Sequence, residues 1–413
     1  MLSSSSMPLP KKETLMQKGA RSLLLKGLAR LNVGSLSIVE YFASGEPQTV
    51  LFGAGQTELQ AEIHVHDIEF YRRVLRGGSI GGAEAYIEGL WDSPNLTAVV
   101  ELVAKNLTML DSVEQQSGKI KQWLTKLGHW LKHNSVKQAK RNIMDHYDLG
   151  NDLYETFLDH HMLYSSALYL HEEESLTQAQ VNKMQRLCAQ LDLKPDDQVL
   201  EIGTGWGAMA IYMAQEYGCQ VTTTTISEEQ YLYAKEKINQ AGLNDRITLL
   251  KQDYRLLDGK FDKLVSIEMI EAVGKRYLAG YLRQCQERLK PGGKMAIQAI
   301  TIADQRYDYY SSNVDFIQKY IFPGGFLPSI TALTCCATHH TDFVVRDLYD
   351  FGLDYGKTLH AWRERFEQQL DTIRSLGYDE KFIRLWRYYF CYCEGGFRAR
   401  TISVIHMTLE RPQ

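Results

Sequence analysis

The sequence lacks any long hydrophobic run. No stretch of about 18 apolar residues, the length that a membrane-spanning helix needs, occurs in the 413-residue chain. The N-terminal segment MLSSSSMPLPKKETL has no apolar core followed by a cleavage site, so it does not resemble a secretory signal. We therefore expect no membrane anchor, and we interpret this segment as a frayed leader.

Strong net charge and regularly spaced cysteines are also missing. The formal net charge is only −4, which gives no indication of a nucleic-acid partner. The seven cysteines are an odd number, and neither Cys335-Cys336 nor Cys391 with Cys393 has the two-residue gap of zinc ligands or redox pairs. With 44% apolar and 23% charged residues, the composition favours a globular cytoplasmic protein with reduced thiols and no bound metal.

Acidic residues are absent from 115 to 144, where basic residues alternate with Trp and Leu at helical spacing. This pattern predicts an amphipathic helix over 119–141, and a second basic stripe covers 18–31 (KGARSLLLKGLARL). Each stripe is explained equally well by a helix packed on its own domain and by a helix at an anionic membrane surface. The stripes alone do not decide between the two.

Changes in composition along the sequence divide the chain into four segments. We expect a leader with a basic helix over 1–30, a small α+β domain over 31–111, a basic helical linker over 112–144 and the main domain over 145–413. The small domain contains strand-like runs such as SLSIVEYF and AEIHVHD, turn residues, and the glycine-rich segment RGGSIGGAEAYIEGLW.

The main domain alternates strand-like and helical segments. Runs such as DQVLEIG, QVTTTTI, RITLLKQD, DKLVSIEM and KMAIQAITI are separated by helical stretches, which predicts an α/β fold with a parallel, doubly wound sheet. After residue 302 we expect a long irregular segment, then helices near 356–376 and 379–393 and a last strand, TISVIHMTL.

A glycine turn follows the first of these strands. Val199 to Ile202 lead directly into Gly203, Gly205 and Gly207, the pattern of a turn that lets a ligand approach the backbone. The dinucleotide spacing G-x-G-x-x-G is absent. The carboxylate of Glu201 can instead pair with an amino group, which fits the zwitterionic end of S-adenosylmethionine better than a phosphate.

Other polar residues follow the next two strands. Thr225 ends the second strand, and Gln230 lies one turn into the following helix, where its amide could bond ribose hydroxyls. Asp253 and Tyr254 follow the third strand, where the edge and face of an adenine would lie. Taken singly, these residues are equally consistent with strand filling and core packing.

Together these residues resemble the cyclopropane-fatty-acyl-phospholipid synthase family. The motifs are most similar to those of its plant-type and proteobacterial members. The resemblance is strong over 140–413 and weaker over 60–105. It is carried, in chain order, by the motifs HYDLGND, YSSA, VLEIGTGWG, TISEEQ, QDYR, IEMIEAVG, YIFPGGFLPS, LHAWRERF and CYCEGGFRAR.

The resemblance implies a Rossmann-like class I methyltransferase sheet with an added N-terminal domain. It implies transfer of a methylene or methyl carbon from S-adenosylmethionine to the double bond of an unsaturated phospholipid acyl chain, with ring closure through a carbocation. By motif, the cofactor contacts are Tyr164, Ser165, Glu201, Gly203, Gly205, Thr225, Gln230, Asp253 and Tyr254.

The resemblance also implies a bicarbonate ion that serves as the base. Its matching positions are Ser166, Glu271, Gln298, Ile300 and Tyr355, with serine and glutamine standing where the better-known bacterial members have cysteine and histidine. Both replacements can still hydrogen-bond an anion. Cys393 matches a reactive cysteine and is implied to line the site. Aromatic faces that could stabilise a cation are those of Tyr254, Tyr307, Tyr355 and Trp362.

A substrate in a bilayer implies docking on an anionic membrane surface, with the protein in the cytoplasm and peripherally attached to the inner face of the membrane. A homodimer is compatible with this picture. Three alternatives stay open: a methyl-branched or methylene product, a class I methyltransferase acting on a soluble small molecule, and a non-catalytic lipid-binding protein that would bind no cofactor.

Overall fold

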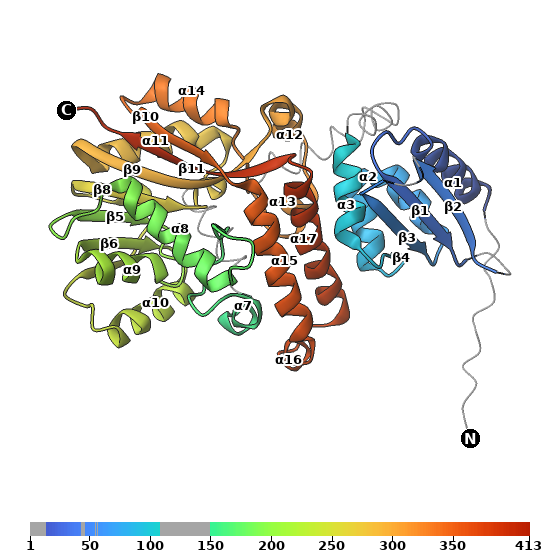
Figure 1. Ribbon diagram of the computed structural model, residues 1–413, viewed down its shortest axis with the longest axis horizontal. Coiled ribbons are helices and arrows are strands. Elements are labelled where there is room, and N and C mark those ends of the chain that lie inside the picture. The colour runs from blue at the N-terminus through green and yellow to red at the C-terminus, as the bar shows by residue number, and fades with distance from the viewer. Residues whose placement is uncertain (1–13, 43–45, 54, 56, 108–148) are drawn as a thin grey trace. The chain divides into compact units, whose positions relative to one another are not determined.

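The computed structural model describes residues 14–42, 46–53, 55, 57–107 and 149–413 (Figure 1). The chain divides into two compact units. The first comprises Met1–Gln122 with Asp379–Ala399, and the second comprises Trp123–Tyr378 with Arg400–Gln413. The basic helix expected over 119–141 lies outside the described residues. Within the described ranges, no helix is both long and apolar enough to cross a membrane.

The first unit contains a four-stranded sheet in the order β2-β1-β3-β4. Strand β1 pairs antiparallel with β2 and parallel with β3, which gives the expected α+β character. The basic stripe over 18–31 forms most of α1, which begins at a Thr14 cap. The elements are α1 (Leu15–Leu28), β1 (Ser35–Glu40), β2 (Gln48–Gly53), β3 (Gln60–Val65), α2 (Glu69–Ile87), β4 (Trp91–Asp92) and α3 (Leu96–Lys105).

The glycine-rich segment of this unit is helical. It forms most of α2, which is kinked at Gly78 (φ 55°, ψ −138°). A Cβ on Gly81 would lie 2.1 Å from the carbonyl oxygen of Arg73, so this close approach within the helix needs glycine. The glycines therefore serve a bent helix.

Helix α17 (Glu380–Arg398) belongs to the first unit, although it lies near the end of the chain. It packs against α3 and α2. Thr97 Oγ1 on α3 donates to the buried Glu394 carboxylate at 2.9 Å, and Arg384 Nη2 donates to Asp92 at 2.8 Å. The structure thus assigns α17 to the first unit, whereas the rest of 149–413 forms the second. The expected division at residue 145 placed this helix in the main domain instead.

The second unit is built on a seven-stranded sheet in the order β10-β11-β9-β8-β5-β6-β7. Strands β5 to β9 are parallel, whereas β11 pairs antiparallel with both β9 and β10. Six of the seven strands therefore run in the same direction, as expected for a parallel sheet, and only β11 is antiparallel. The strands are β5 (Gln198–Ile202), β6 (Gln220–Thr225), β7 (Ile247–Lys251), β8 (Phe261–Ile267), β9 (Leu289–Ile302), β10 (Val344–Asp350) and β11 (Ile402–Glu410).

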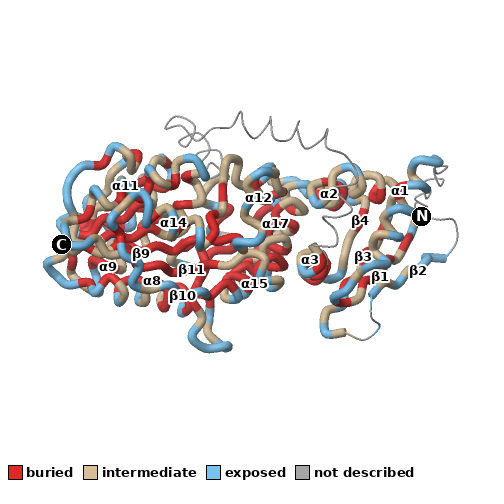
Figure 2. The backbone as a smooth tube through the Cα atoms, turned by 90° about the horizontal axis from the view of Figure 1, so that it is seen from above, coloured by how far each residue is buried: buried red, intermediate tan, exposed pale blue. Residues whose placement is uncertain are grey.

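Helices cover both faces of this sheet, and a separate apolar cluster lies under each face. Side chains of α8 (Leu176–Leu191), α9 (Ala208–Tyr217) and α10 (Glu228–Gln240) pack with Val199 on one face. Side chains of α11 (Leu278–Arg288) and α14 (Ile330–His340) pack with Leu200 on the other. Alternate residues of each strand thus enter opposite clusters, and Figure 2 shows the buried course of β9 and β11.

The segment after residue 302 is more ordered than its sequence suggested. Helix α14 and strand β10 lie in the region expected to be irregular, which is a correction to the sequence-based prediction. Exposed and half-exposed residues dominate β10, an edge strand, so it has no two-residue apolar alternation to detect. The remaining helices are α7 (Asn151–Phe157), α12 (Tyr307–Ser312), α13 (Phe316–Tyr320), α15 (Gly352–Gln368) and α16 (Leu370–Ser375).

Candidate active site

A cavity of about 170 Å³ lies at the carboxyl ends of β5, β6, β7 and β8. This edge is where open α/β sheets bind ligands. All nine residues that the resemblance assigns to the cofactor line it, although they come from four separate stretches of chain: Tyr164, Ser165, Glu201, Gly203, Gly205, Thr225, Gln230, Asp253 and Tyr254.

The floor of the cavity is the glycine turn between β5 and α9. Gly203, Gly205 and Gly207 have φ values of 102°, 54° and 98°, a region that side-chain-bearing residues rarely adopt. A Cβ built on Gly205 meets no atom within 4 Å. The turn therefore presents bare backbone to open space, as a ligand-binding turn requires.

Glu201, the acidic residue before the turn, is buried. Thr223 Oγ1 on the neighbouring strand donates to its carboxylate at 2.5 Å. Burial raises the pKa of Glu201 to about 8, and the bond from Thr223 opposes this rise. A cationic amino group placed beside it would favour the ionised carboxylate.

The residues expected at the ribose and adenine positions are already held in place by contacts within the protein. Thr225 Oγ1 donates to the Gln230 side-chain oxygen at 2.8 Å, which leaves the amide N–H groups of Gln230 to donate. Asp253 forms a bidentate pair with Arg255, at 2.9 and 2.7 Å. Arg255 also lines the cavity and was not identified from the sequence. Tyr254 contacts the Tyr281 ring edge-on at 5.4 Å.

A buried lysine lies beside the cavity and was also missed. Lys183 on α8 is fully buried, and its Nζ donates to Ser165 Oγ at 2.7 Å. Burial lowers its pKa to about 8, and the nearby Glu268 opposes this effect. Lys183 and the equally buried Gln180 occupy the stripe of α8 that otherwise carries apolar residues. Polar residues within an otherwise apolar helical stripe were thus the sequence feature that could have identified Lys183 as a candidate.

The residues predicted to hold bicarbonate converge instead on Glu268, the residue after β8. Its Oε1 accepts the backbone N–H of Ser166 and Nε2 of Gln298, both at 2.8 Å. Its Oε2 accepts the hydroxyl of Tyr355 at 2.7 Å. His406 Nε2 lies 2.8 Å from the Gln298 side-chain oxygen and so fixes the orientation of that amide. Three of the five predicted groups therefore surround a protein carboxylate that was not singled out from the sequence.

Glu271 and Ile300, the other two predicted bicarbonate neighbours, contact each other. The backbone N–H of Ile300 donates to Glu271 Oε1 at 2.5 Å, whereas Glu271 Oε2 is buried without a hydrogen-bond partner. Burial and the adjacent Glu268 raise the pKa of Glu271 to about 8. None of the five predicted bicarbonate neighbours lines the cavity, but Glu268 does.

The four aromatic candidates for cation stabilisation differ in position. Tyr254 lines the cavity. Trp362 is fully buried between Tyr164 and Tyr355, with ring centroids 5.2 and 6.0 Å away. Tyr307 already has the Lys275 ammonium 4.8 Å from its ring centre. The geometry therefore favours Tyr254 as a cavity aromatic and gives Trp362 the role of supporting Tyr164 and Tyr355.

Cys393 lies on α17 in the first unit and is half-buried. It is not among the residues that line the cavity of the second unit, so its assignment to the site stays a prediction. All seven cysteines are free thiols.

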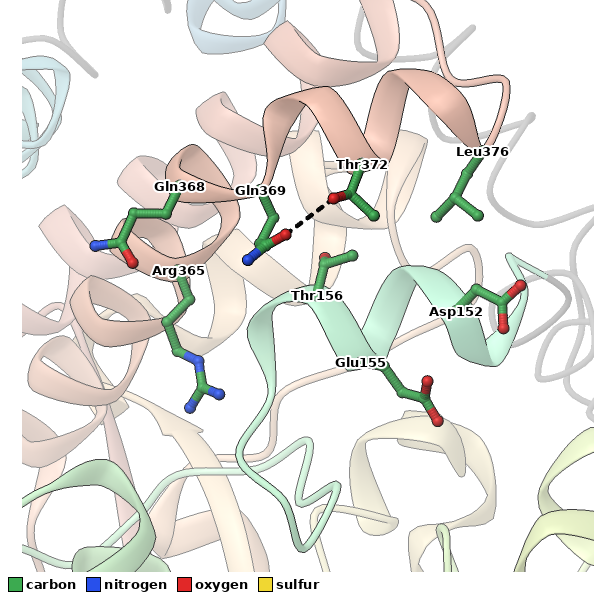
Figure 3. A pocket seen from close by; sticks show the side chains of 8 residues that line it. All are labelled: Asp152, Glu155, Thr156, Arg365, Gln368, Gln369, Thr372 and Leu376. Atoms are coloured by element: carbon green, nitrogen blue, oxygen red, sulfur yellow. Dashed lines mark hydrogen bonds between the residues drawn. The ribbon is translucent and has the colours of Figure 1, made fainter.

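A second cavity, of about 490 Å³, opens between α7 and the helices α15 and α16 (Figure 3). Its lining is mostly polar, and Gln369 Oε1 accepts the Thr372 hydroxyl at 2.9 Å on one wall. None of the predicted site residues lies there. It is therefore separate from the candidate active site.

The sheet order, the single antiparallel strand β11 and the cavity above the glycine turn define a class I methyltransferase. Solved structures of two cyclopropane synthases have the same fold. The cyclopropane synthase MmaA2 from Mycobacterium tuberculosis has a TM-score of 0.61 and 25% identity, covering 66% of this chain and 98% of that one. Mycolic acid cyclopropane synthase CmaA1, complexed with SAH and CTAB, has the same TM-score and coverage at 26% identity.

Sequence comparisons identify the family. Residues 134–407 match the family described as "Mycolic acid cyclopropane synthetase". The cyclopropane-fatty-acyl-phospholipid synthase of Escherichia coli K12 is 38% identical, covering 85% of this chain and 88% of its own. Tuberculostearic acid methyltransferase UfaA1 of M. tuberculosis is 39% identical, covering 82% and 81%.

The chain therefore belongs to the mycolic acid cyclopropane synthetase family. It is an S-adenosylmethionine-dependent methyltransferase, and its reaction is one-carbon transfer to an unsaturated lipid.

Proposed function

We propose that the protein transfers one carbon from S-adenosylmethionine to the double bond of a phospholipid acyl chain and closes a cyclopropane ring. The observation that carries this proposal is the convergence of all nine predicted cofactor residues on one cavity that also contains the Glu268 carboxylate. A cofactor site beside a buried carboxylate is what methyl transfer followed by proton removal requires.

The chemistry places modest demands on the protein. The sulfonium is already activated, so the site must align the alkene with the methyl carbon, exclude water and stabilise a carbocation. A desolvated aromatic face contributes about 2 kcal/mol to such a cation, and Tyr254 is the member of the four candidate aromatics that lines the cavity. Ser166, Glu271, Gln298, Ile300, Tyr355 and Cys393 remain the residues assigned to the reacting centre by resemblance.

The choice of product is a separate part of the proposal, because the relatives carry different names. One is a cyclopropane synthase and another a tuberculostearic acid methyltransferase. Proton loss from the new methyl group closes a ring, whereas proton loss from the chain leaves a methyl-branched or methylene product. A carboxylate that lines the cofactor cavity supports ring closure, because a base beside the transferred carbon can remove a proton from it.

The test uses purified full-length protein, S-adenosylmethionine and vesicles of an unsaturated phospholipid. Mass spectrometry should show a gain of one CH2 group on the acyl chain and loss of the double bond. A gain with the double bond retained would replace ring closure by a methylated alkene. If the protein bound the cofactor but modified only a soluble molecule, the lipid substrate would be wrong. A protein that bound no cofactor would be an inert lipid binder.

We also propose that the protein works in the cytoplasm at an anionic bilayer surface, with α1 as one docking element. Leu15, Met16 and Leu23 on this helix are 90%, 63% and 58% exposed. Lys18 and Lys26 on the same helix are exposed as well. Apolar side chains beside lysines are what an anionic interface attracts, at roughly 1 kcal/mol per basic residue near the surface.

Vesicle co-sedimentation tests the docking. Charge reversal of Lys18 and Lys26 to Glu should weaken binding to anionic vesicles at low salt, and high salt should weaken binding of the parent protein. Arg21 is left intact because it pairs with the buried Glu40 at 2.6 Å. The exposed Lys235 on α10 offers a matched control, Lys235→Glu. Equal binding by all three proteins would remove α1 from the proposal.

A further inference from the structure

Glu268 occupies the position that the resemblance reserves for bicarbonate. A second anion there would need the donors of Ser166, Gln298 and Tyr355, but all three already bond the Glu268 carboxylate. It would also meet the negative charge of that carboxylate at close range. The residues present therefore do not fit a separate bicarbonate ion.

The backbone at Glu268 supports a built-in role. Its φ of 48° is in the left-handed region, which a residue with a long side chain rarely adopts. Its N–H donates to the carbonyl oxygen of Gln298 at 2.8 Å, which ties this conformation to β9. Such strain persists where the surrounding structure holds it and is concentrated at functional sites.

Charge is distributed unequally between Glu268 and Glu271. Burial raises the pKa of Glu268, but its three hydrogen-bond donors and the nearby Lys183 oppose this rise by stabilising the ionised form. Glu271 has the N–H of Ile300 on one oxygen and no partner for the other. Two adjacent buried carboxylates do not both ionise readily, so Glu268 is the anion and Glu271 holds the proton.

We propose that Glu268 replaces bicarbonate as the base of this enzyme. The inference rests on the proposed one-carbon transfer. In that reaction the alkene π-electrons form a bond to the methyl carbon, and the S–C bond breaks with its electron pair left on sulfur. A C–H bond of the new methyl group then breaks. Its electrons form the third bond of the ring, and the proton moves to a Glu268 carboxylate oxygen, from which it leaves to solvent after the products depart.

The first test asks whether bicarbonate is needed. Lipid turnover by the parent protein is measured in buffer freed of carbon dioxide and again with added bicarbonate. The expected result is the same rate in both. A rate that collapses without bicarbonate and recovers when it is added would overturn the proposal.

The second test changes the base itself. Glu268→Gln should lower turnover by about a hundredfold or more, within the range of a positioned base, while calorimetric affinity for S-adenosylhomocysteine stays close to that of the parent. Glu216→Gln, on an exposed face of α9, is the matched control and should retain the parent rate. Full turnover by Glu268→Gln would overturn the proposal.

Glu268→Gly gives an independent arm, because glycine accepts the positive φ and so removes the carboxylate without new backbone strain. The substitution leaves the donors of Ser166, Gln298 and Tyr355 without the carboxylate that they bond. This variant should be slow alone and accelerated by added bicarbonate or formate, whereas Glu268→Gln, which still fills the space, should not respond. Absence of rescue in a Glu268→Gly protein that binds cofactor normally would count against the assignment.

The controls separate this inference from the function on which it rests. If the parent protein makes no modified lipid with or without bicarbonate, the proposed function fails. If it makes modified lipid only with bicarbonate, the proposed function stands and Glu268 is not the base.

Discussion

Gly205 carries the most direct test of the cofactor site at the scale of single residues. Its φ of 54° disfavours any residue with a side chain, and the open space above its backbone leaves room for a ligand. Gly205→Val should therefore abolish binding of S-adenosylmethionine, because the branched side chain would project into the cavity and strain the turn. Calorimetry measures the binding. Retained affinity in a folded variant would mean that the cofactor lies elsewhere.

The Glu201 carboxylate links cofactor binding to pH. Burial raises its pKa to about 8 in the free protein, so it is largely protonated at pH 7. The cofactor's amino group favours the ionised form and lowers this pKa, so binding at pH 7 should release a proton. Affinity should rise as the pH increases towards 8.

Calorimetry in buffers of different ionisation enthalpy counts that proton. The release should disappear in Glu201→Gln, whose amide cannot ionise, and this variant also serves as the control for protons from the cofactor itself. A parent protein whose binding enthalpy is the same in every buffer would contradict the assigned pKa.

Local patterns made part of the site predictable. The glycine turn, Glu201 and Gln230 each lie within a few residues of a strand end, where sequence spacing alone indicates a ligand. Glu268 was missed because its importance comes from contacts made far along the chain, whereas Lys183 had a local signal as a polar residue on the buried stripe of α8. Glu268 meets Tyr355 across 87 positions. No periodicity in a single sequence encodes such a meeting.

Helix α2 provides the prediction at the scale of an element. A Cβ on Gly81 would lie 2.1 Å from a backbone oxygen, whereas one on Gly77 would meet nothing within 4 Å. Gly81→Ala should therefore destabilise the first unit by at least ~1–3 kcal/mol, the usual cost of overpacking. Gly77→Ala should be neutral or slightly stabilising, because alanine favours a helix.

Denaturant unfolding followed by circular dichroism compares the two variants. Equal midpoints for Gly81→Ala and Gly77→Ala would mean that α2 is not kinked as described. The kink also explains why this element escaped prediction. Several closely spaced glycines usually mark turns, and only the packing of the bent helix makes them useful within one.

The strands and helices of the second unit were more predictable than its edge. Alternating apolar runs from Val199 onward indicated β5 to β9 correctly, because each of these strands is buried and bounded by turn residues. Strand β10 was missed because its side chains are mostly exposed or half-exposed. Its place in the sheet comes from hydrogen bonding to β11, which leaves no trace in the apolar pattern.

At the scale of the whole molecule, two compact units predict two unfolding events. The cofactor cavity is lined only by residues of the second unit. S-Adenosylhomocysteine at 100 times its dissociation constant should stabilise that unit by about 2.7 kcal/mol. Differential scanning calorimetry should show one transition moving to higher temperature and the other staying in place. A single transition that shifts as a whole would show that the units unfold together.

The position of α17 also affects the order in which the chain can fold during synthesis. The strands of the first unit are complete once α3 has been made, but α17 follows only after β5 to β10. Gly395 lies so close to Val100 that an added Cβ would meet its Cγ1 at 2.7 Å, which shows how tightly α17 covers α3. At ribosomal speeds of roughly 5–20 residues per second, α3 waits on the order of tens of seconds for that cover. The nascent N-terminal unit therefore leaves one face of α3 uncovered until α17 has been made, an interval in which a chaperone has a surface to bind.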